Sequence, residues 1–335
     1  MAKLLSDEVP EIYHYTTITG LKGIIESQTL WATHYAYLND TEEIIHFKSQ
    51  LSIILEPVVK AGLVELVRQA PTNQSMIDQH GGIEKICDEI PNVILRVSYK
   101  VLLGDKTNPS LAEPYVVSFC TPGNNREKEH GLLSQWRGYG EDGGYVVAFG
   151  TKKIEQLLVM EGDKWGYDEL FGGDIVYSSS GEAKIHEEFG QYLDDIKNGV
   201  KELFSIRPNE QALDKLYSPI VRCSCRYKHW GFEEEKEVRI VAIPLSPEVR
   251  RMAQAEDRTL KPEKPKKHFV RRGLAVPYID LFENISISSG KRLPITRIIV
   301  GPHPEKDKRR KAVKILLQQH GIEAPVSVSA IPYLC

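Results

Sequence analysis

The segment Lys228–Arg239, KHWGFEEEKEVR, carries carboxylates and an arginine at alternating positions. In a strand that starts at residue 235, Glu235, Glu237 and Arg239 share one face, because successive side chains point to opposite faces. The next residues, IVAI at 240–243, are apolar and indicate a central strand. A glutamate held by an arginine stays ionised and accepts a hydrogen bond from a sugar hydroxyl. The alternative is an ion pair at a strand end, which satisfies charges that are costly to bury alone.

The segment YHYTT at 13–17 is a second candidate. Strand alternation places His14 and Thr16 on one face and Tyr13 and Tyr15 on the other. A histidine that bonds a ligand hydroxyl beside an aromatic ring suits nucleotide recognition. The alternative, which the residues alone favour, is a buried histidine bonded to a backbone carbonyl.

A third candidate joins SFC at 118–120 with LSQWRGYG at 133–140. Trp136, Arg137 and Tyr139 offer rings for stacking and a guanidinium that suits a phosphate. A core tryptophan beside a surface arginine explains them equally well. The string GYGEDG at 138–143 precedes a strand rather than opening a helix, so it predicts a turn and not a dinucleotide fingerprint.

The elements that must position these residues are predicted from periodicity and capping. Helices are expected over 18–27, from residue 40 or 41 with a break at Pro57, over 181–218, and over 306–319. Strands are expected over 30–35, 115–120, 145–149, 174–177, 238–243, 273–279, 297–300 and 326–331. A flexible loop is expected at 255–267. We expect an α+β fold (mixed α/β) with a central mixed β-sheet, in one domain over 1–335 with helical insertions at about 40–104 and 181–218.

The bulk composition excludes several classes of protein. The 335 residues carry a net charge of −3, which argues against a general nucleic-acid binder but leaves room for a local basic patch. Five scattered cysteines form no disulfide framework and show no metal-ligand spacing, so no metal is expected. There is no apolar run of about 20 residues and no signal-peptide pattern at the start, so we expect a cytoplasmic protein without a membrane partner.

The chain resembles a bacterial family, domain of unknown function 2971. The resemblance rests on short strings that occur in this order along nearly the whole chain. They are HYT at 14–16, LWAT at 30–33, LNDTEE at 38–43, SFC at 118–120, LLSQWRGYG at 132–140, KHWGFEEEKEVRI at 228–240, VPYIDL at 276–281, IIVGP at 298–302 and SAIPY at 329–333.

The resemblance implies a similarity to ADP-ribosyltransferase-type folds, which open with a strand carrying His or Arg, then a helix and a short strand, and place a catalytic Glu on a later strand. It implies NAD as substrate, with Glu237 or Glu235 catalytic. The residues implied to bind NAD are His14, Tyr15, Thr16, Trp136, Arg137, Tyr139 and Arg239, with Arg271 as a further pyrophosphate candidate. The enzyme would be a transferase or an NAD glycohydrolase, as a toxin or phage-defence effector, with a protein or nucleic-acid acceptor.

Two other functions stay open. In a metal-dependent phosphodiesterase or nuclease, Asp40, Glu43, Glu235 and Glu237 would gather a divalent cation. A non-catalytic nucleotide sensor or interaction module would bind a ligand without turnover. The basic stretch 306–314 would serve nucleic acid in any of these, although a solvated helix face explains it more simply.

Overall fold

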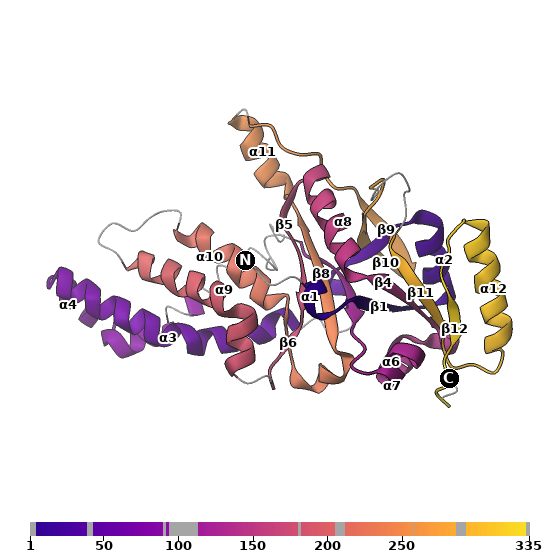
Figure 1. Ribbon diagram of the computed structural model, residues 1–335. Helices are drawn as coiled ribbons and strands as arrows, with labels where there is room; N and C mark the ends of the chain where they lie inside the picture. Colours follow the sequence, from indigo (N-terminus) through magenta and orange to yellow (C-terminus); the bar gives the residue numbers. More distant parts are fainter. Residues whose placement is uncertain are drawn as a thin grey trace. The chain divides into compact units, whose positions relative to one another are not determined.

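The computed structural model describes residues 5–38, 43–89, 92–93, 113–179, 182–204, 212–256, 258–285 and 293–332. The chain divides into two compact units (Figure 1). The first combines Met1–Tyr37, Pro114–Ile175 and Phe232–Cys335, and the second combines Leu38–Glu113 and Val176–Gly231. The two segments predicted as helical insertions fall in the second unit.

The first unit is built on a sheet to which ten described strands contribute. These strands are β1 Glu11–Thr16, β2 Leu30–His34, β3 Tyr115–Cys120, β4 Tyr145–Gly150, β5 Tyr167–Asp174, β8 Glu237–Pro244, β9 Lys266–Arg271, β10 Leu274–Leu281, β11 Ile295–Val300 and β12 Val326–Val328. The pair β11 and β12 is parallel and the other pairs are antiparallel, so the predicted central mixed sheet is confirmed. Every residue of β8 is buried, as predicted for a central strand.

The sheet divides along one edge of β3. Every residue of β3 pairs with β8, so β1 and β2 must both lie on the other edge of β3. Strand β1 meets that edge at Tyr13 and Cys120, and β2 meets it at Thr33 and Val116 and at the neighbouring pair. The sheet therefore has two parts, β12-β11-β4-β1 and β5-β8-β3-β2-β10-β9, joined where Tyr13 faces Cys120.

Helix α2 (Ile18–Ser27) connects β1 to β2, and its boundaries follow from the sequence. The Thr17 side chain accepts a hydrogen bond from the Gly20 amide at 3.3 Å, which caps an otherwise unpaired donor. Leu21, Ile24 and Ile25 form the buried face, whereas Ile18, which the helical spacing places with them, is exposed. The helix ends where the next residue adopts a left-handed conformation.

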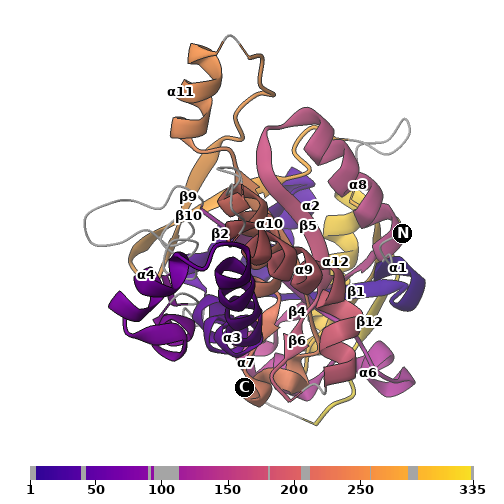
Figure 2. The same ribbon diagram turned by 90° about the vertical axis from the view of Figure 1, so that its left-hand side faces the viewer.

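The remaining helices of the first unit surround the sheet. They are α1 Leu5–Glu8, α6 Asn125–His130, α7 Leu133–Tyr139, α8 Thr151–Lys164, α11 Pro247–Ala255 and α12 Lys306–Gln319, with 3₁₀ turns η1 Tyr35–Tyr37 and η2 Glu141–Gly143. Helices α2 and α12 lie side by side, and α11 lies at the end of the unit opposite to α6 and α7 (Figures 1 and 2). The main core contains apolar side chains from both parts of the sheet and from α2, α8 and α12.

The second unit is mainly helical. Its elements are α3 Glu43–Gln69, α4 Asn73–Gln79, α9 Glu182–Leu203, α10 Ala212–Ser224, and the short parallel pair β6 Val176–Tyr177 and β7 Tyr227–Lys228. Helices α3, α9 and α10 contact one another. The turn η3, Trp230–Glu235, leads back into the first unit.

Two predictions about the elements were wrong. Helix α3 continues through Pro57, where a break was expected. Proline has no amide hydrogen, so the carbonyl of Ile53, four residues earlier, loses its helical hydrogen bond. Because Ile53 is 65% exposed, water can bond that carbonyl instead. The strand predicted over 174–177 is two elements, the end of β5 and the separate β6. The loop predicted at 255–267 is present between α11 and β9, although Lys264 within it is fully buried and β9 already begins at Lys266. In the part of the chain that the structure describes, no helix combines the length and the apolar character needed to cross a lipid bilayer.

Candidate functional site

Glu237 and Arg239 form a buried ion pair at the start of β8. The Arg239 Nε donates to Glu237 Oε1 at 2.6 Å, and its Nη2 donates to Oε2 at 3.0 Å. The two side chains are 5% and 4% exposed. The two residues share one face of β8, as the alternation predicts. Across the β3 edge, Glu237 lies opposite Cys120 and Arg239 lies opposite Ser118.

Glu235 does not join this pair through the strand, so the prediction of a strand from residue 235 was wrong. Glu235 is the last residue of η3, and β8 begins at Glu237. Lys236 between them has a φ of +46°, a left-handed conformation that interrupts the alternation of side chains. The Lys236 Nζ is held by Glu127 Oε2 at 2.8 Å, which fixes this turn against the start of α6.

His14 lies on β1 where that strand leaves β3. The Ser118 carbonyl lies 3.0 Å from His14 Nδ1, and a carbonyl can only accept, so Nδ1 carries the proton. Burial lowers the pKa of His14 below its ordinary value, which keeps the ring neutral at pH 7. The Nε2 atom of this tautomer has a lone pair that can accept a hydrogen bond from a hydroxyl. The bond to the Ser118 carbonyl also matches the alternative to nucleotide binding, which is a buried histidine that only supports the fold.

Ser118 connects the two predicted parts of the site. Its carbonyl binds His14, and it faces Arg239 in the β3–β8 register. His14 and Glu237 nevertheless occupy opposite faces of the sheet at this point, because Tyr13, Cys120 and Glu237 are in register and His14 follows Tyr13 on the strand. The structure brings the two residues to neighbouring strands but not to one face.

Tyr15 and Trp136 pack in a second apolar cluster. Their ring centroids are 4.8 Å apart at an interplanar angle of 73°. The Trp136 ring is fully buried, and its Nε1 donates to the His130 carbonyl at 2.9 Å. The Tyr15 hydroxyl accepts from the Leu132 amide at 2.6 Å. Both rings are enclosed by protein, which matches the alternative of a core tryptophan rather than a ring that stacks on NAD.

The other predicted binding residues are accessible. Arg137 and Tyr139 are exposed on α7, and Thr16 is half-buried at the end of β1. The Thr16 hydroxyl lies directly over Gly20, where an added Cβ would be 2.0 Å from it. The tight contact holds the start of α2 close to β1.

A cavity of about 280 Å³ opens beside the first turn of α2. It is lined by Thr17, Ile18, Thr19, Asp142, Tyr145 and Arg309. Arg309 also donates to Asp142 Oδ2 at 2.7 Å and so is held in place. The volume is slightly smaller than that of typical sites for drug-sized ligands. Sequence reasoning missed this cavity, because Arg309 belongs to a helix interpreted as a solvated face.

Among the residues that the structure describes, the carboxylates predicted for the alternative metal site do not form a cluster. Asp40 lies outside the described residues, as does the side chain of Glu43. Glu235 lies on a turn outside the strand, and Arg239 holds both oxygens of Glu237. The four cysteines that the structure describes are free thiols.

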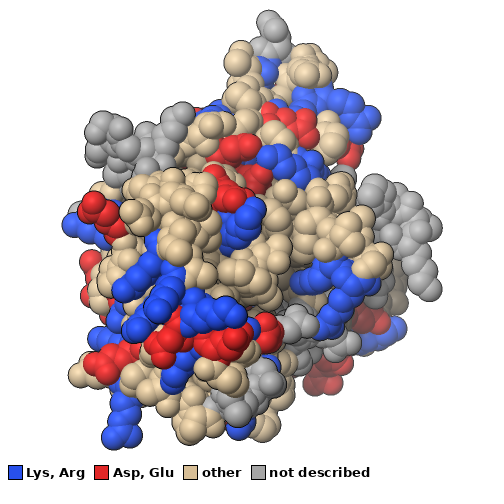
Figure 3. Space-filling view, turned by 90° about the vertical axis from the view of Figure 1, so that its right-hand side faces the viewer, with Lys and Arg blue, Asp and Glu red and all other residues tan. Residues whose placement is uncertain are grey.

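The basic helix α12 is partly neutralised by its neighbours. Lys308 pairs with Glu305 at 3.1 Å, and Arg310 pairs with Asp307 at 2.9 Å. Figure 3 shows Lys and Arg interspersed with Asp and Glu on the side of the molecule where α12 lies. These pairs favour the simpler interpretation of 306–314 as a solvated face.

The turn predicted before β4 is confirmed, since Gly143 and Gly144 have positive φ angles.

The family model described as "Protein of unknown function (DUF2971)" matches residues 135–240. The matched region runs from α7 to the middle of β8 and contains Glu237, Arg239 and Trp136, but not His14. It supports the resemblance over less than half of the chain. Comparison with curated proteins and with solved structures gives no match.

Proposed function

We propose that this chain is an NAD-using enzyme of the ADP-ribosyltransferase type, a transferase or an NAD glycohydrolase, with Glu237 as its catalytic carboxylate. The observation that carries this proposal is the buried Glu237–Arg239 pair at the start of a central strand. A bidentate arginine favours the charged form of a carboxylate and fixes its direction.

The order of elements supports the same class of fold. Strand β1 carries His14, α2 and the short β2 follow, and Glu237 opens the later strand β8. This is the order that the family resemblance implies for ADP-ribosyltransferase-type enzymes. The neutral His14 has an Nε2 that can accept a hydrogen bond from a hydroxyl, and the cavity beside Thr17 lies at the N-terminus of α2, which favours a negatively charged group.

The proposed chemistry requires one well-placed negative charge. The C–N bond between ribose and nicotinamide breaks, and nicotinamide leaves with the bonding electron pair. The ribose becomes oxocarbenium-like, as in glycoside cleavage, and Glu237 stabilises that positive charge. Water or an acceptor group then bonds to the anomeric carbon and loses a proton, for which the same carboxylate is the nearest assigned base.

Two assigned roles change in this proposal. Tyr15 and Trp136 support the sheet from within a core cluster, so the exposed Tyr139 is the remaining ring for stacking on nicotinamide. Glu235 is left out of the catalytic step because it precedes the strand. His14 and Glu237 lie on opposite faces of the sheet and β3 is paired on both edges, so one ribose bonded to Glu237 does not also contact His14.

The experiment is incubation of the purified full chain with NAD, followed by chromatography for free nicotinamide and for ADP-ribose. The reaction is run in buffer alone and with protein, single-stranded DNA or RNA as acceptor. Nicotinamide release supports the proposal, and the fate of ADP-ribose separates hydrolysis from transfer. Saturable NAD binding without release under all conditions would overturn it and favour the nucleotide-sensing alternative.

A further inference from the structure

The hairpin of β9 and β10 carries an unusual charge distribution. Residues 266–272, KKHFVRR, contain four lysines or arginines, one histidine and no acidic residue. Strand β9 is the terminal strand of its part of the sheet, so it lies at an edge. This local excess of positive charge stands against a net charge of −3 for the whole chain.

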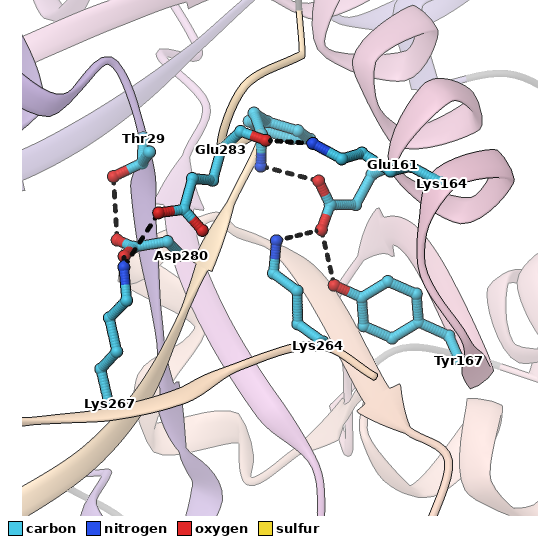
Figure 4. Close-up of polar contacts among 9 residues, drawn as sticks. Thr29, Glu161, Lys164, Tyr167, Lys264, Lys267, Asp280 and Glu283 are labelled. Carbon is cyan, nitrogen blue, oxygen red and sulfur yellow. Dashed lines mark hydrogen bonds and ion pairs between the residues drawn. The ribbon is translucent and has the colours of Figure 1, made fainter. Parts of the chain in front are cut away.

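The base of the hairpin is neutralised internally (Figure 4). Lys264 and Glu161 are both fully buried and pair at 2.6 Å. Lys267 pairs with Asp280 at 2.6 Å and with Glu283 at 3.0 Å. These carboxylates account for the two cations at the base and anchor the hairpin to the rest of the first unit.

The far end of the hairpin is different. Arg271 and Arg272 are exposed, and neither lies within ion-pair distance of a carboxylate of the described residues. Arg271 donates a hydrogen bond to the backbone carbonyl of Tyr37, which orients its guanidinium without neutralising it. Two arginines thus present positive charge to solvent from a fixed hairpin.

Three aromatic rings lie on the same face of the sheet. Trp31 of β2 is 40% exposed, and its ring centroid lies 5.4 Å from that of Phe269 and 4.6 Å from that of Tyr278. The register places them together: Tyr278 faces Lys267, and Phe269 and Arg271 alternate with it on β9. An exposed tryptophan supported by two rings is a platform for a flat ligand beside the arginines.

We propose that this hairpin surface, formed by Trp31, Phe269, Tyr278, Arg271 and Arg272, binds single-stranded nucleic acid. Cations along the strand contact phosphates, and exposed aromatic rings stack with bases that are not paired. A duplex hides the faces of its bases, and an acidic peptide has no bases, so neither uses Trp31 in this way. This binding goes beyond the proposed NAD chemistry and does not require it.

The test measures fluorescence anisotropy of labelled oligo(dT) and oligo(U) of 15 nucleotides, without NAD, at low and high salt. The wild-type chain is compared with Trp31→Ala and with Arg271→Gln/Arg272→Gln. Lys311→Gln/Lys314→Gln on α12 is the matched control, because it removes the same charge from exposed positions elsewhere. Thermal melting checks that each variant folds; the arginine variant changes only exposed side chains and keeps the test valid if Trp31→Ala does not fold.

We expect saturable binding by the wild type that weakens as salt rises. Trp31→Ala should weaken it about fivefold or more, the value for loss of one stacked base. The double arginine variant should also bind several times more weakly, and the α12 control should bind like the wild type. No binding by the wild type would overturn the proposal. So would equal binding of a duplex or of polyglutamate, or equal losses in the α12 control.

Discussion

Arg239 holds both carboxylate oxygens of Glu237, two residues before it on the same strand, and both side chains are buried. The pair begins immediately after Lys236, whose left-handed backbone ends the preceding turn. A carboxylate placed this way has a fixed direction, and a preorganised direction is what stabilisation of a developing positive charge requires.

Removing one partner of this pair should cost far more than removing both. Arg239→Met leaves the Glu237 carboxylate buried without its counter-ion, and we expect the free energy of unfolding to fall by about 3–5 kcal/mol. Glu237→Leu/Arg239→Met should recover most of that loss. Urea denaturation of the three proteins measures this. Equal stability of Arg239→Met and the wild type would contradict the buried pair.

Acid should destabilise the fold in part through His14. Burial lowers its pKa in the folded state, so the unfolded chain binds a proton first as the pH falls below about 6.5. The stabilising contribution is therefore complete above about pH 6.5 and is lost below it. His14→Asn keeps a donor for the Ser118 carbonyl but does not titrate. Urea midpoints at pH 7.5 and 5.5 should differ less in His14→Asn than in the wild type, and an identical difference would contradict the assignment.

Gly20 should not tolerate alanine, although alanine normally stabilises a helix interior. Its Cβ would lie 2.0 Å from the Thr16 hydroxyl, so we expect Gly20→Ala to destabilise the fold by roughly 1–3 kcal/mol. Thr16→Ala in the same chain removes the clash and should restore most of the stability. Thermal melting of the single and double variants checks this. A more stable Gly20→Ala protein would show that β1 and α2 are further apart.

The ion pair of Lys264 should matter for stability, and an exposed pair should not. Lys264→Met leaves Glu161 buried with hydrogen bonds from Tyr167 and from the Phe282 amide but without a cation. We expect a loss of about 3–5 kcal/mol in the free energy of unfolding. Arg68→Met is the control, because its pair with Glu65 is exposed, and it should change little. Similar effects of both variants on urea unfolding would contradict the buried position of Lys264.

Much of the fold could be predicted from local patterns. Strand β3 and helix α12 have the predicted bounds, because a short apolar run and helical periodicity are local properties. Strand β9 was missed because its residues are mostly exposed and charged, which gives no apolar signal. Its pairing with β10 and the burial of Lys264 depend on contacts distant in sequence.

The candidate site was predicted only in part for a related reason. The Glu237–Arg239 pair follows from strand alternation within three residues. The faces taken by Glu235 and His14 depend on the turn at Lys236 and on the register across β3, which no local pattern encodes. The packing of Trp136 was equally compatible with a binding role until its buried position was known.

The most direct test of the central claim compares nicotinamide release from NAD by the wild type, Glu237→Gln and Glu235→Gln, with melting curves to show that all three are folded. The two variants make the same chemical change two residues apart, on and off the strand. We predict nicotinamide release by the wild type and a similar rate for Glu235→Gln. For Glu237→Gln we predict a rate that is lower by about 100-fold or by a larger factor. No release by the folded wild type with every acceptor, or equal rates for Glu237→Gln and the wild type, would contradict the assignment of Glu237 as the catalytic carboxylate.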